Sequence, residues 1–160
     1  MKKQIEYYAK RAKEYDSVYE KPERQADIQH LRAILSKFFA QQNVIDIGCG
    51  TGYWSEIIAQ SAKSLTGIDI NESVLQIARG RTYNCPTTFT RGSYFDLKIE
   101  EEFDGLMGGF VYSHVEKSQR SLFFDQILKR LKPKGQGLLL DNRYVAGSST
   151  PIHRTDAEGN

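Results

Sequence analysis

Three glycines at alternate positions, preceded by a carboxylate, form the stretch of this sequence best suited to hold a ligand. Gly48, Gly50 and Gly52 directly follow an apolar run that contains Asp46. Glycine takes positive φ angles and lets another group approach the bare backbone, so a glycine turn between a strand and a helix suits a nucleotide-like ligand. The dinucleotide pattern G-x-G-x-x-G would need its third glycine where Tyr53 stands. The spacing therefore argues against a dinucleotide.

A second acid, Asp69, lies about 20 residues beyond this turn, at the predicted end of the next strand. A carboxylate offers only acceptors, so Asp69 could accept hydrogen bonds from both hydroxyls of a ribose. The alternative is a structural role, because Asp69 and Asn71 precede a predicted helix and could cap it.

The segment D-I-G-C-G-T-G, residues 46–52, resembles motif I of the class I S-adenosylmethionine-dependent methyltransferases, whose pattern is D/E-x-G-x-G-x-G. Two further segments resemble the same family: F-D-G-L, which opens a fourth strand, and L-K-P-K-G-Q-G, which precedes a fifth. The resemblance covers about residues 1–145 and implies a Rossmann-like domain of the small-molecule type. Such a domain binds S-adenosylmethionine and transfers its methyl group to a small acceptor.

The resemblance also implies which residues contact the cofactor. Asp46 would orient its polar end, Asp69 would hold the ribose, and Ile70 would pack on the adenine. Ser93 stands where related enzymes commonly place an acid at the adenine amino group. Either Ser93 and the amide of Tyr94 would contact the adenine edge instead, or this contact would be weaker than in those enzymes. The complete predicted cofactor set is Asp46, Gly48, Cys49, Gly50, Gly52, Asp69, Ile70, Ser93, Tyr94, Gly108 and Gly109.

Acceptor-binding residues are predicted in the N-terminal segment and after the fourth strand. Tyr8, Arg11 and Tyr15 share one face of a helix by their spacing. The run Y-Y-A-K-R-A-K-E-Y-D resembles a segment that lies over the cofactor in many small-molecule methyltransferases, which implies a lid; a helix packed on the domain is the alternative. Tyr112 would contact the acceptor. His114 is the candidate general base, since its unperturbed pKa of about 6.5 suits proton removal, and a pocket wall is its alternative role.

Alternating strand and helix patterns must position these residues, and they predict an α/β fold. We expect a doubly wound, mostly parallel sheet of about five strands with helices on both faces. Residues 1–145 would form the domain, with 1–40 as its N-terminal helical or lid segment, and residues 146–160 a polar loop or tail. Strands are predicted at 44–47, 64–70, 87–91, 103–110 and 136–144, and helices at 23–39, 53–61, 72–79 and 118–131.

The size, charge and cysteine content of the chain limit which kinds of binding partner we expect. The chain has 160 residues, a usual size for one domain, and its net charge of +2 is too small to indicate a nucleic-acid surface. Neither a signal peptide nor a membrane span is expected. Cys49 and Cys85 form no metal-ligand pattern, so we predict no metal and interpret both as reduced thiols of a cytoplasmic protein.

Two alternatives to a methyltransferase stay open. The family's sheet usually has seven strands, of which the last two form a hairpin, and only five are predicted here. The fifth strand would then leave an exposed edge, through which a homodimer could form. The chain could also bind S-adenosylmethionine without catalysis, because its acceptor pocket would be incomplete. A NAD-dependent oxidoreductase is less favoured, since Tyr53 replaces the third glycine.

Overall fold

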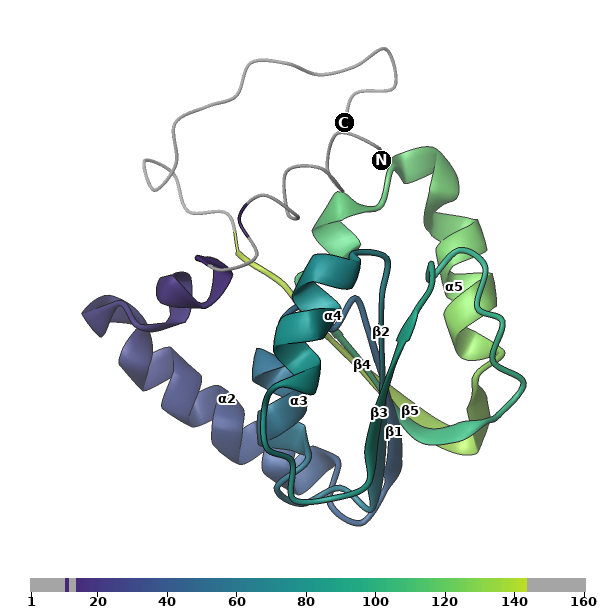
Figure 1. The fold of residues 1–160 in the computed structure, drawn as a ribbon. Helices are drawn as coiled ribbons and strands as arrows, with labels where there is room; N and C mark the ends of the chain where they lie inside the picture. The colour runs from purple at the N-terminus through teal and green to yellow at the C-terminus, as the bar shows by residue number, and fades with distance from the viewer. Residues whose placement is uncertain (1–10, 12–13, 144–160) are drawn as a thin grey trace.

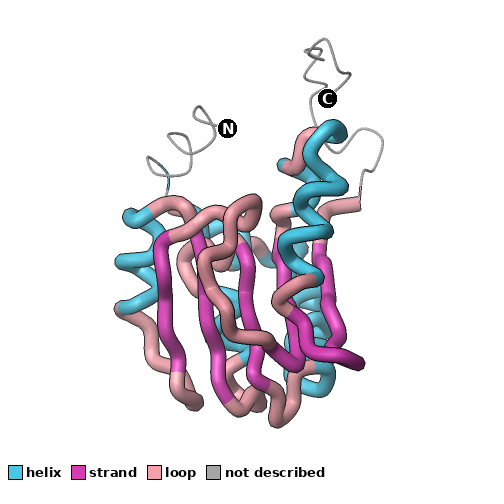
Figure 2. The backbone as a smooth tube through the Cα atoms, turned by 90° about the vertical axis from the view of Figure 1, so that its right-hand side faces the viewer, coloured by secondary structure: helices cyan, strands magenta, loops and turns pink. Residues whose placement is uncertain are grey.

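The computed structural model describes residue 11 and residues 14–143, and a parallel sheet forms the centre of the fold. The strand order is β3-β2-β1-β4-β5, and every neighbouring pair is parallel. Figure 2 shows the strands side by side. Because all of them are parallel, their carboxyl ends lie at one edge of the sheet. The strands are β1 (Asn43–Ile47), β2 (Ser64–Asp69), β3 (Thr87–Arg91), β4 (Phe103–Gly109) and β5 (Leu131–Leu140). This arrangement confirms the predicted α/β class.

Helices cover both faces of the sheet, as predicted. Figure 1 shows α2, α3 and α4 on one face and α5 on the other. The helices are α2 (Gln25–Phe38), α3 (Tyr53–Ile58), α4 (Glu72–Arg79) and α5 (Arg120–Leu128). No helix in the described residues is long and apolar enough to cross a lipid bilayer.

The central strand β1 is buried on both faces because alternate side chains of a strand point to opposite sides. Val44 packs in one core cluster with Trp54 of α3. Ile45 and Ile47 pack in the other cluster with Phe123 of α5. This two-sided burial explains the nearly unbroken apolar run before the glycine turn.

Two short 3₁₀ helices, η1 (Tyr15–Tyr19) and η2 (Pro22–Arg24), lead into α2. Tyr19 anchors η1 to α3, since its side chain is buried and its ring stacks on Tyr53 at 4.2 Å between centroids. The indole Nε1 of Trp54 also donates a hydrogen bond to the Tyr19 hydroxyl at 3.1 Å. The described part of the N-terminal segment therefore lies against the start of α3.

The predicted boundaries near the C-terminal side of the domain are partly wrong. The helix predicted at 118–131 is shorter, since α5 begins at Arg120 and ends at Leu128, and Ser118 lies in the 3₁₀ helix η4 (Lys117–Gln119). Leu131 already pairs with Phe103, and residues 132–135 form an irregularity before pairing resumes. The L-K-P-K-G run thus opens a strand instead of ending a helix, because Leu131 packs against the α5 side of the core.

Candidate functional site

A cavity lies at the carboxyl edge of the sheet, where the segments after four strands meet. The loops after β1, β2, β3 and β4 each contribute to its wall, and η1 and α4 complete it. The lining residues are Tyr15, Gly48, Gly50, Asp69, Ile70, Asn71, Val74, Gly92, Ser93, Tyr94, Gly109, Phe110, Val111 and His114. Seven of the predicted cofactor residues belong to this set, whereas Asp46, Cys49, Gly52 and Gly108 do not.

The three glycines of the turn all have positive φ angles, of 63° at Gly48, 56° at Gly50 and 78° at Gly52. A Cβ atom at Gly48 would lie 2.3 Å from a methyl carbon of Val111, and one at Gly52 would lie 2.4 Å from the hydroxyl of Tyr83. A Cβ at Gly50 would meet nothing within 4 Å. Gly48 and Gly52 are therefore required by packing, and Gly50 presents open backbone to the cavity.

Asp69, at the end of the neighbouring strand β2, holds this glycine turn in place by a hydrogen bond. Its Oδ2 accepts a hydrogen bond from the amide of Gly50, and its Oδ1 accepts one from the amide of Asn71, each at 2.9 Å. Burial raises the pKa of Asp69, and the backbone donors oppose that shift. Each carboxylate oxygen keeps further acceptor capacity. Asp69 thus fixes the loops after β1 and β2 through their amides and also faces the cavity. The helix cap weighed above is not formed, since Asn71, the N-cap residue of α4, makes no side-chain capping hydrogen bond.

Asp46 does not reach the cavity. It is 2% exposed and shares the face of β1 that α3 covers, where its Oδ2 accepts a 2.5 Å hydrogen bond from the hydroxyl of Ser55. Burial raises its pKa to about 7, while the Ser55 hydrogen bond acts in the other direction. Direct contact between Asp46 and the polar end of a cofactor is therefore not supported, and Asp46 instead ties β1 to α3.

Cys49 and Gly108 also serve packing instead of lining the cavity. Cys49 is buried, its amide donates to the carbonyl of Ile68 at 3.0 Å, and its Sγ would lie 3.0 Å from a Cβ at Gly67. A Cβ at Gly108 would lie 2.7 Å from Leu139. Both positions demand small side chains because neighbouring strands are packed tightly there.

A second cavity, of about 380 Å³, adjoins the first. Tyr15, Phe110 and His114 line both cavities, and Arg11 lines the second. Its other lining residues are Glu14, Ser17, Val18, Tyr19, Lys21, Arg24, Ser113 and Asn142. The predicted acceptor residue Tyr8 lies outside the described residues.

Tyr112 is placed differently from the prediction. Its ring lies 6.1 Å from that of Phe123 and 5.0 Å from the guanidinium of Arg120, so it packs on α5. Tyr112 and His114 begin and end the 3₁₀ helix η3 (Tyr112–His114). Residues two apart in such a helix point in different directions. This explains why His114 lines the cavities and Tyr112 does not.

His114 is the titratable nitrogen base at the wall shared by the two cavities. Partial burial lowers the pKa of His114, and the nearby carboxylate of Asp141 opposes this shift. The imidazole is therefore neutral at pH 7 and able to accept a proton.

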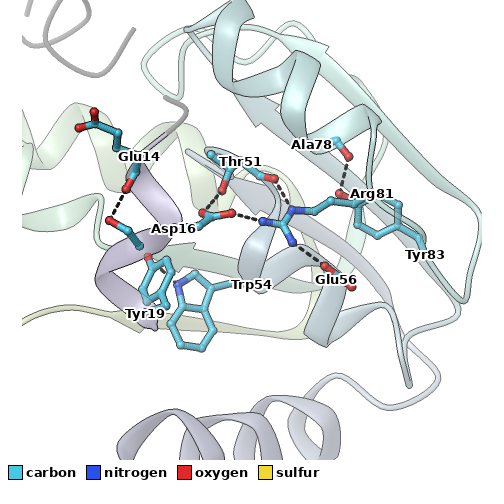
Figure 3. A network of polar contacts seen from close by, with 10 residues as sticks. Glu14, Asp16, Tyr19, Thr51, Trp54, Glu56, Ala78, Arg81 and Tyr83 are labelled. Atoms are coloured by element: carbon cyan, nitrogen blue, oxygen red, sulfur yellow. Dashed lines mark hydrogen bonds and ion pairs between the residues drawn. The ribbon is translucent and has the colours of Figure 1, made fainter. Parts of the chain in front are cut away.

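An ion-pair cluster that the sequence analysis missed joins the N-terminal segment to the glycine turn (Figure 3). We call it the Arg81 clasp, and it consists of Arg81, Asp16, Thr51 and Glu56. The guanidinium of Arg81 pairs with Asp16 and, at 2.6 Å, with Glu56, and its Nε donates to the carbonyl of Thr51 at 2.7 Å. The Thr51 hydroxyl donates to Asp16 at 2.5 Å. No pattern marks Arg81, which lies in a loop after α4.

Comparison with known proteins gives a family and several relatives. The model of the methyltransferase domain family matches residues 44–135, more than half of the chain. The malonyl-[acyl-carrier protein] O-methyltransferase of Priestia megaterium is 23% identical over 145 residues, covering 89% of this chain and 51% of that protein. The demethylmenaquinone methyltransferase of Tropheryma whipplei is 29% identical over 116 residues, covering 72% and 48%. The chain spans about half the length of these curated relatives.

Solved structures share the fold. The DhpI–SAH complex superposes with a TM-score of 0.75 at 22% identity, covering 98% of this chain and 74% of that chain. The N-methyltransferase NodS from Bradyrhizobium japonicum WM9, in complex with S-adenosyl-L-homocysteine, gives a TM-score of 0.60 at 22% identity, covering 69% and 60%. The sequence match and the parallel sheet with its glycine turn agree, and this chain belongs to the methyltransferase domain family.

Proposed function

We propose that this domain binds S-adenosylmethionine and transfers its methyl group to a small-molecule acceptor. The observation that carries the proposal is the pairing of Asp69 with the Gly50 amide on the wall of the first cavity. That pairing supports the proposal because it sets a carboxylate, the kind of group that accepts hydrogen bonds from ribose hydroxyls, beside open backbone at the carboxyl edge of a parallel sheet.

The described residues fit this cofactor. Gly50 leaves space for close approach, and Asp69 retains acceptor capacity for ribose hydroxyls. Ile70, Val74 and Tyr94 give the same cavity apolar surface suited to an adenine ring. Family membership and the solved complexes of similar proteins support the same ligand.

Bound S-adenosylmethionine would supply an electron-poor methyl group on a sulfonium sulfur, which needs no acid to activate it. The protein would then contribute to catalysis mainly by orienting the acceptor toward the methyl group. Tyr15 and Phe110 would hold an acceptor in the second cavity against the first, since both line both cavities. His114 would take the proton from an acceptor oxygen or nitrogen, because its lowered pKa keeps it neutral.

Calorimetric titration with S-adenosylmethionine, S-adenosylhomocysteine and NAD tests the cofactor. We expect the two sulfur compounds to bind and NAD not to bind; the opposite pattern would favour an oxidoreductase and overturn the proposal. Transfer of label from [methyl-³H]S-adenosylmethionine to a panel of small acceptors tests the reaction. Cofactor binding without transfer to any acceptor would favour a binding protein.

Three further proposals concern the setting of this domain. We propose a cytoplasmic location, because Cys49 and Cys85 are both free thiols. We propose that nucleic acid is not the acceptor, because the net charge is only +2. We propose a homodimer through β5, which has one neighbour, β4, within the described sheet. Light scattering tests the last of these, since a monomeric mass at micromolar concentration would contradict it.

A further inference from the structure

The two adjoining cavities differ in charge. Among the described residues of the first cavity, Asp69 is the side chain with a formal charge at neutral pH, with His114 neutral. The second cavity is lined by three cationic side chains and one carboxylate, which are Arg11, Lys21, Arg24 and Glu14. A cationic sulfonium compound suits the first balance, and an anion suits the second.

Two of these cations have no carboxylate partner in the part of the chain that the structure describes. Arg11 faces Glu14, with Nε and Oε2 3.8 Å apart. Within residues 14–143, no carboxylate lies within ion-pair distance of Lys21 or Arg24. Asp27 and Asp141 share a third cavity with Arg24 but are not paired with it. Arg24 is half-buried, and a guanidinium removed from water without a counter-charge is costly.

The local backbone brings the two unpaired cations together. The amide of Arg24 donates to the carbonyl of Lys21 at 3.0 Å, which closes a 3₁₀ turn. Lys21, the N-cap residue, and Arg24 are thus the first and last residues of one tight turn. The side chain of Gln25 fastens the turn by donating to the carbonyls of Tyr19, at 2.8 Å, and Lys21, at 3.1 Å.

We propose that the second cavity holds the methyl acceptor by an anionic oxygen group (a carboxylate, phosphate or phosphonate) bound by Arg24 and Lys21. This inference rests on the proposed function. Arg24 and Lys21 line the second cavity and not the first, whereas His114 lines both. The anionic group therefore lies away from the shared wall, and a separate hydroxyl or amine of the acceptor faces the cofactor.

The proposed methyl transfer needs no group beyond the acceptor, S-adenosylmethionine and His114. The acceptor oxygen or nitrogen forms a bond to the methyl carbon of S-adenosylmethionine, and the carbon–sulfur bond breaks with its electron pair returning to sulfur. The proton of the nucleophile passes to the neutral imidazole of His114. Arg24 and Lys21 change neither charge nor bonding, so their role is to position the acceptor.

Amide NMR of the ¹⁵N-labelled chain, loaded with S-adenosylhomocysteine, tests the anion site. Inorganic phosphate, acetate and neutral acetamide are added in turn at constant ionic strength. We expect phosphate or acetate to shift the amides of Lys21 and Arg24 saturably, and acetamide not to do so; the tighter anion identifies the class of group. Equal shifts with acetamide, or no saturable shift with either anion, would overturn the inference.

Variants assign the site to its residues. We expect Arg24→Gln to weaken anion binding about tenfold and Lys21→Gln about threefold, because charge-assisted hydrogen bonds are lost. Arg79→Gln is the matched control, since this exposed arginine of α4 pairs with Glu72 and lines none of the three cavities. Affinity for S-adenosylhomocysteine should change less than about twofold in all three variants.

The outcomes separate the two proposals. If Arg24→Gln binds the anion as tightly as the wild type, the anionic-acceptor inference is wrong while the proposed function stands. If the wild type does not bind S-adenosylhomocysteine at all, the proposed function itself fails. Retained cofactor binding in Arg24→Gln also shows that the variant is folded.

Discussion

The two cavities share the wall formed by Tyr15, Phe110 and His114, yet they are built in different ways. The first depends on the carboxyl ends of parallel strands, whose hydrogen-bond register fixes where Gly50 and Asp69 lie. The second depends on η1, η2 and the chain after β4, which approach one another only through tertiary contacts. The sheet therefore mainly specifies the first cavity, the proposed cofactor site, and the N-terminal segment contributes most to the second, the proposed acceptor site.

Replacing His114 tests the wall that the cavities share and should have the largest effect. Loss of a general base typically slows turnover by about 10²–10⁴-fold, so we expect His114→Gln to lower kcat by this amount with little change in cofactor affinity. In the wild type, kcat/KM should rise with pH through a pKa below 6.5 and then level off, because the neutral imidazole is the active form. A variant with unchanged kcat would reduce His114 to a pocket wall.

Replacing Asp46 tests the buried contact between β1 and α3 that lies next to the first cavity. Its pKa of about 7 in the folded chain lies above the ordinary value of 3.8, so the folded state retains a proton that the unfolded state loses between these values. Wild-type stability should therefore fall as pH rises from 4 to 7, by at most about 4 kcal/mol from this group. Urea unfolding of Asp46→Asn across this range should show that contribution removed.

Asp104 provides the opposite case as a control for that experiment. Hydrogen bonds from the Asn43 amide and from Lys132 lower the pKa of Asp104. Its contribution to stability should thus be present at neutral pH and be lost as pH falls below about 4. Asp104→Asn should leave the decline between pH 4 and 7 in place; if it removed that decline, the role assigned to Asp46 would be wrong.

Asp69 tests the cofactor cavity alone. Asp69→Ala should weaken binding of S-adenosylhomocysteine by about 1–3 kcal/mol, since hydrogen bonds to a charged partner are lost. Anion binding in the second cavity should not change, because Asp69 does not line it. Asp96→Ala, at an exposed acid after β3, is the control. Equal affinity in Asp69→Ala and the wild type, measured by calorimetry, would exclude a ribose contact.

The Arg81 clasp should couple the two cavities, with the smallest of these effects. Arg81→Met leaves Asp16 without its cationic partner, and we expect a loss of about 1–2 kcal/mol in unfolding free energy because the pair is only partly exposed. Ligand binding in both cavities should weaken together, since Tyr15 adjoins Asp16 and lines both.

Arg79→Met is the matched control, because its ion pair with Glu72 is about 40% exposed on both sides and should contribute less than about 1 kcal/mol. Proteolysis near Arg11, followed by mass spectrometry, should be faster in Arg81→Met than in Arg79→Met. Equal rates would mean that the clasp does not hold the N-terminal segment.

The different construction of the two cavities also explains how much of each could be predicted from the sequence. The apolar run of β1, the glycines after it and Asp69 are local signals, and seven of the eleven residues predicted from such signals and from the family resemblance line one cavity. Local signals cannot tell which side of a buried strand faces a helix, so the hydrogen bond from Ser55 to Asp46 was not predicted. Arg81 was missed because its partners are distant in sequence, and Tyr112 was misplaced because the turn of η3 decides its direction.

The span of the Arg81 clasp has a consequence for folding kinetics. Asp16 and Arg81 are 65 residues apart, and contacts that close long loops generally form late because of their entropic cost. We expect the N-terminal segment to dock after the transition state, on a sheet that is already assembled. In stopped-flow measurements, Asp16→Asn should then accelerate unfolding and leave the refolding rate almost unchanged. The first cavity would thus have all its described wall except Tyr15 on the folding pathway before η1 and η2 complete the second cavity.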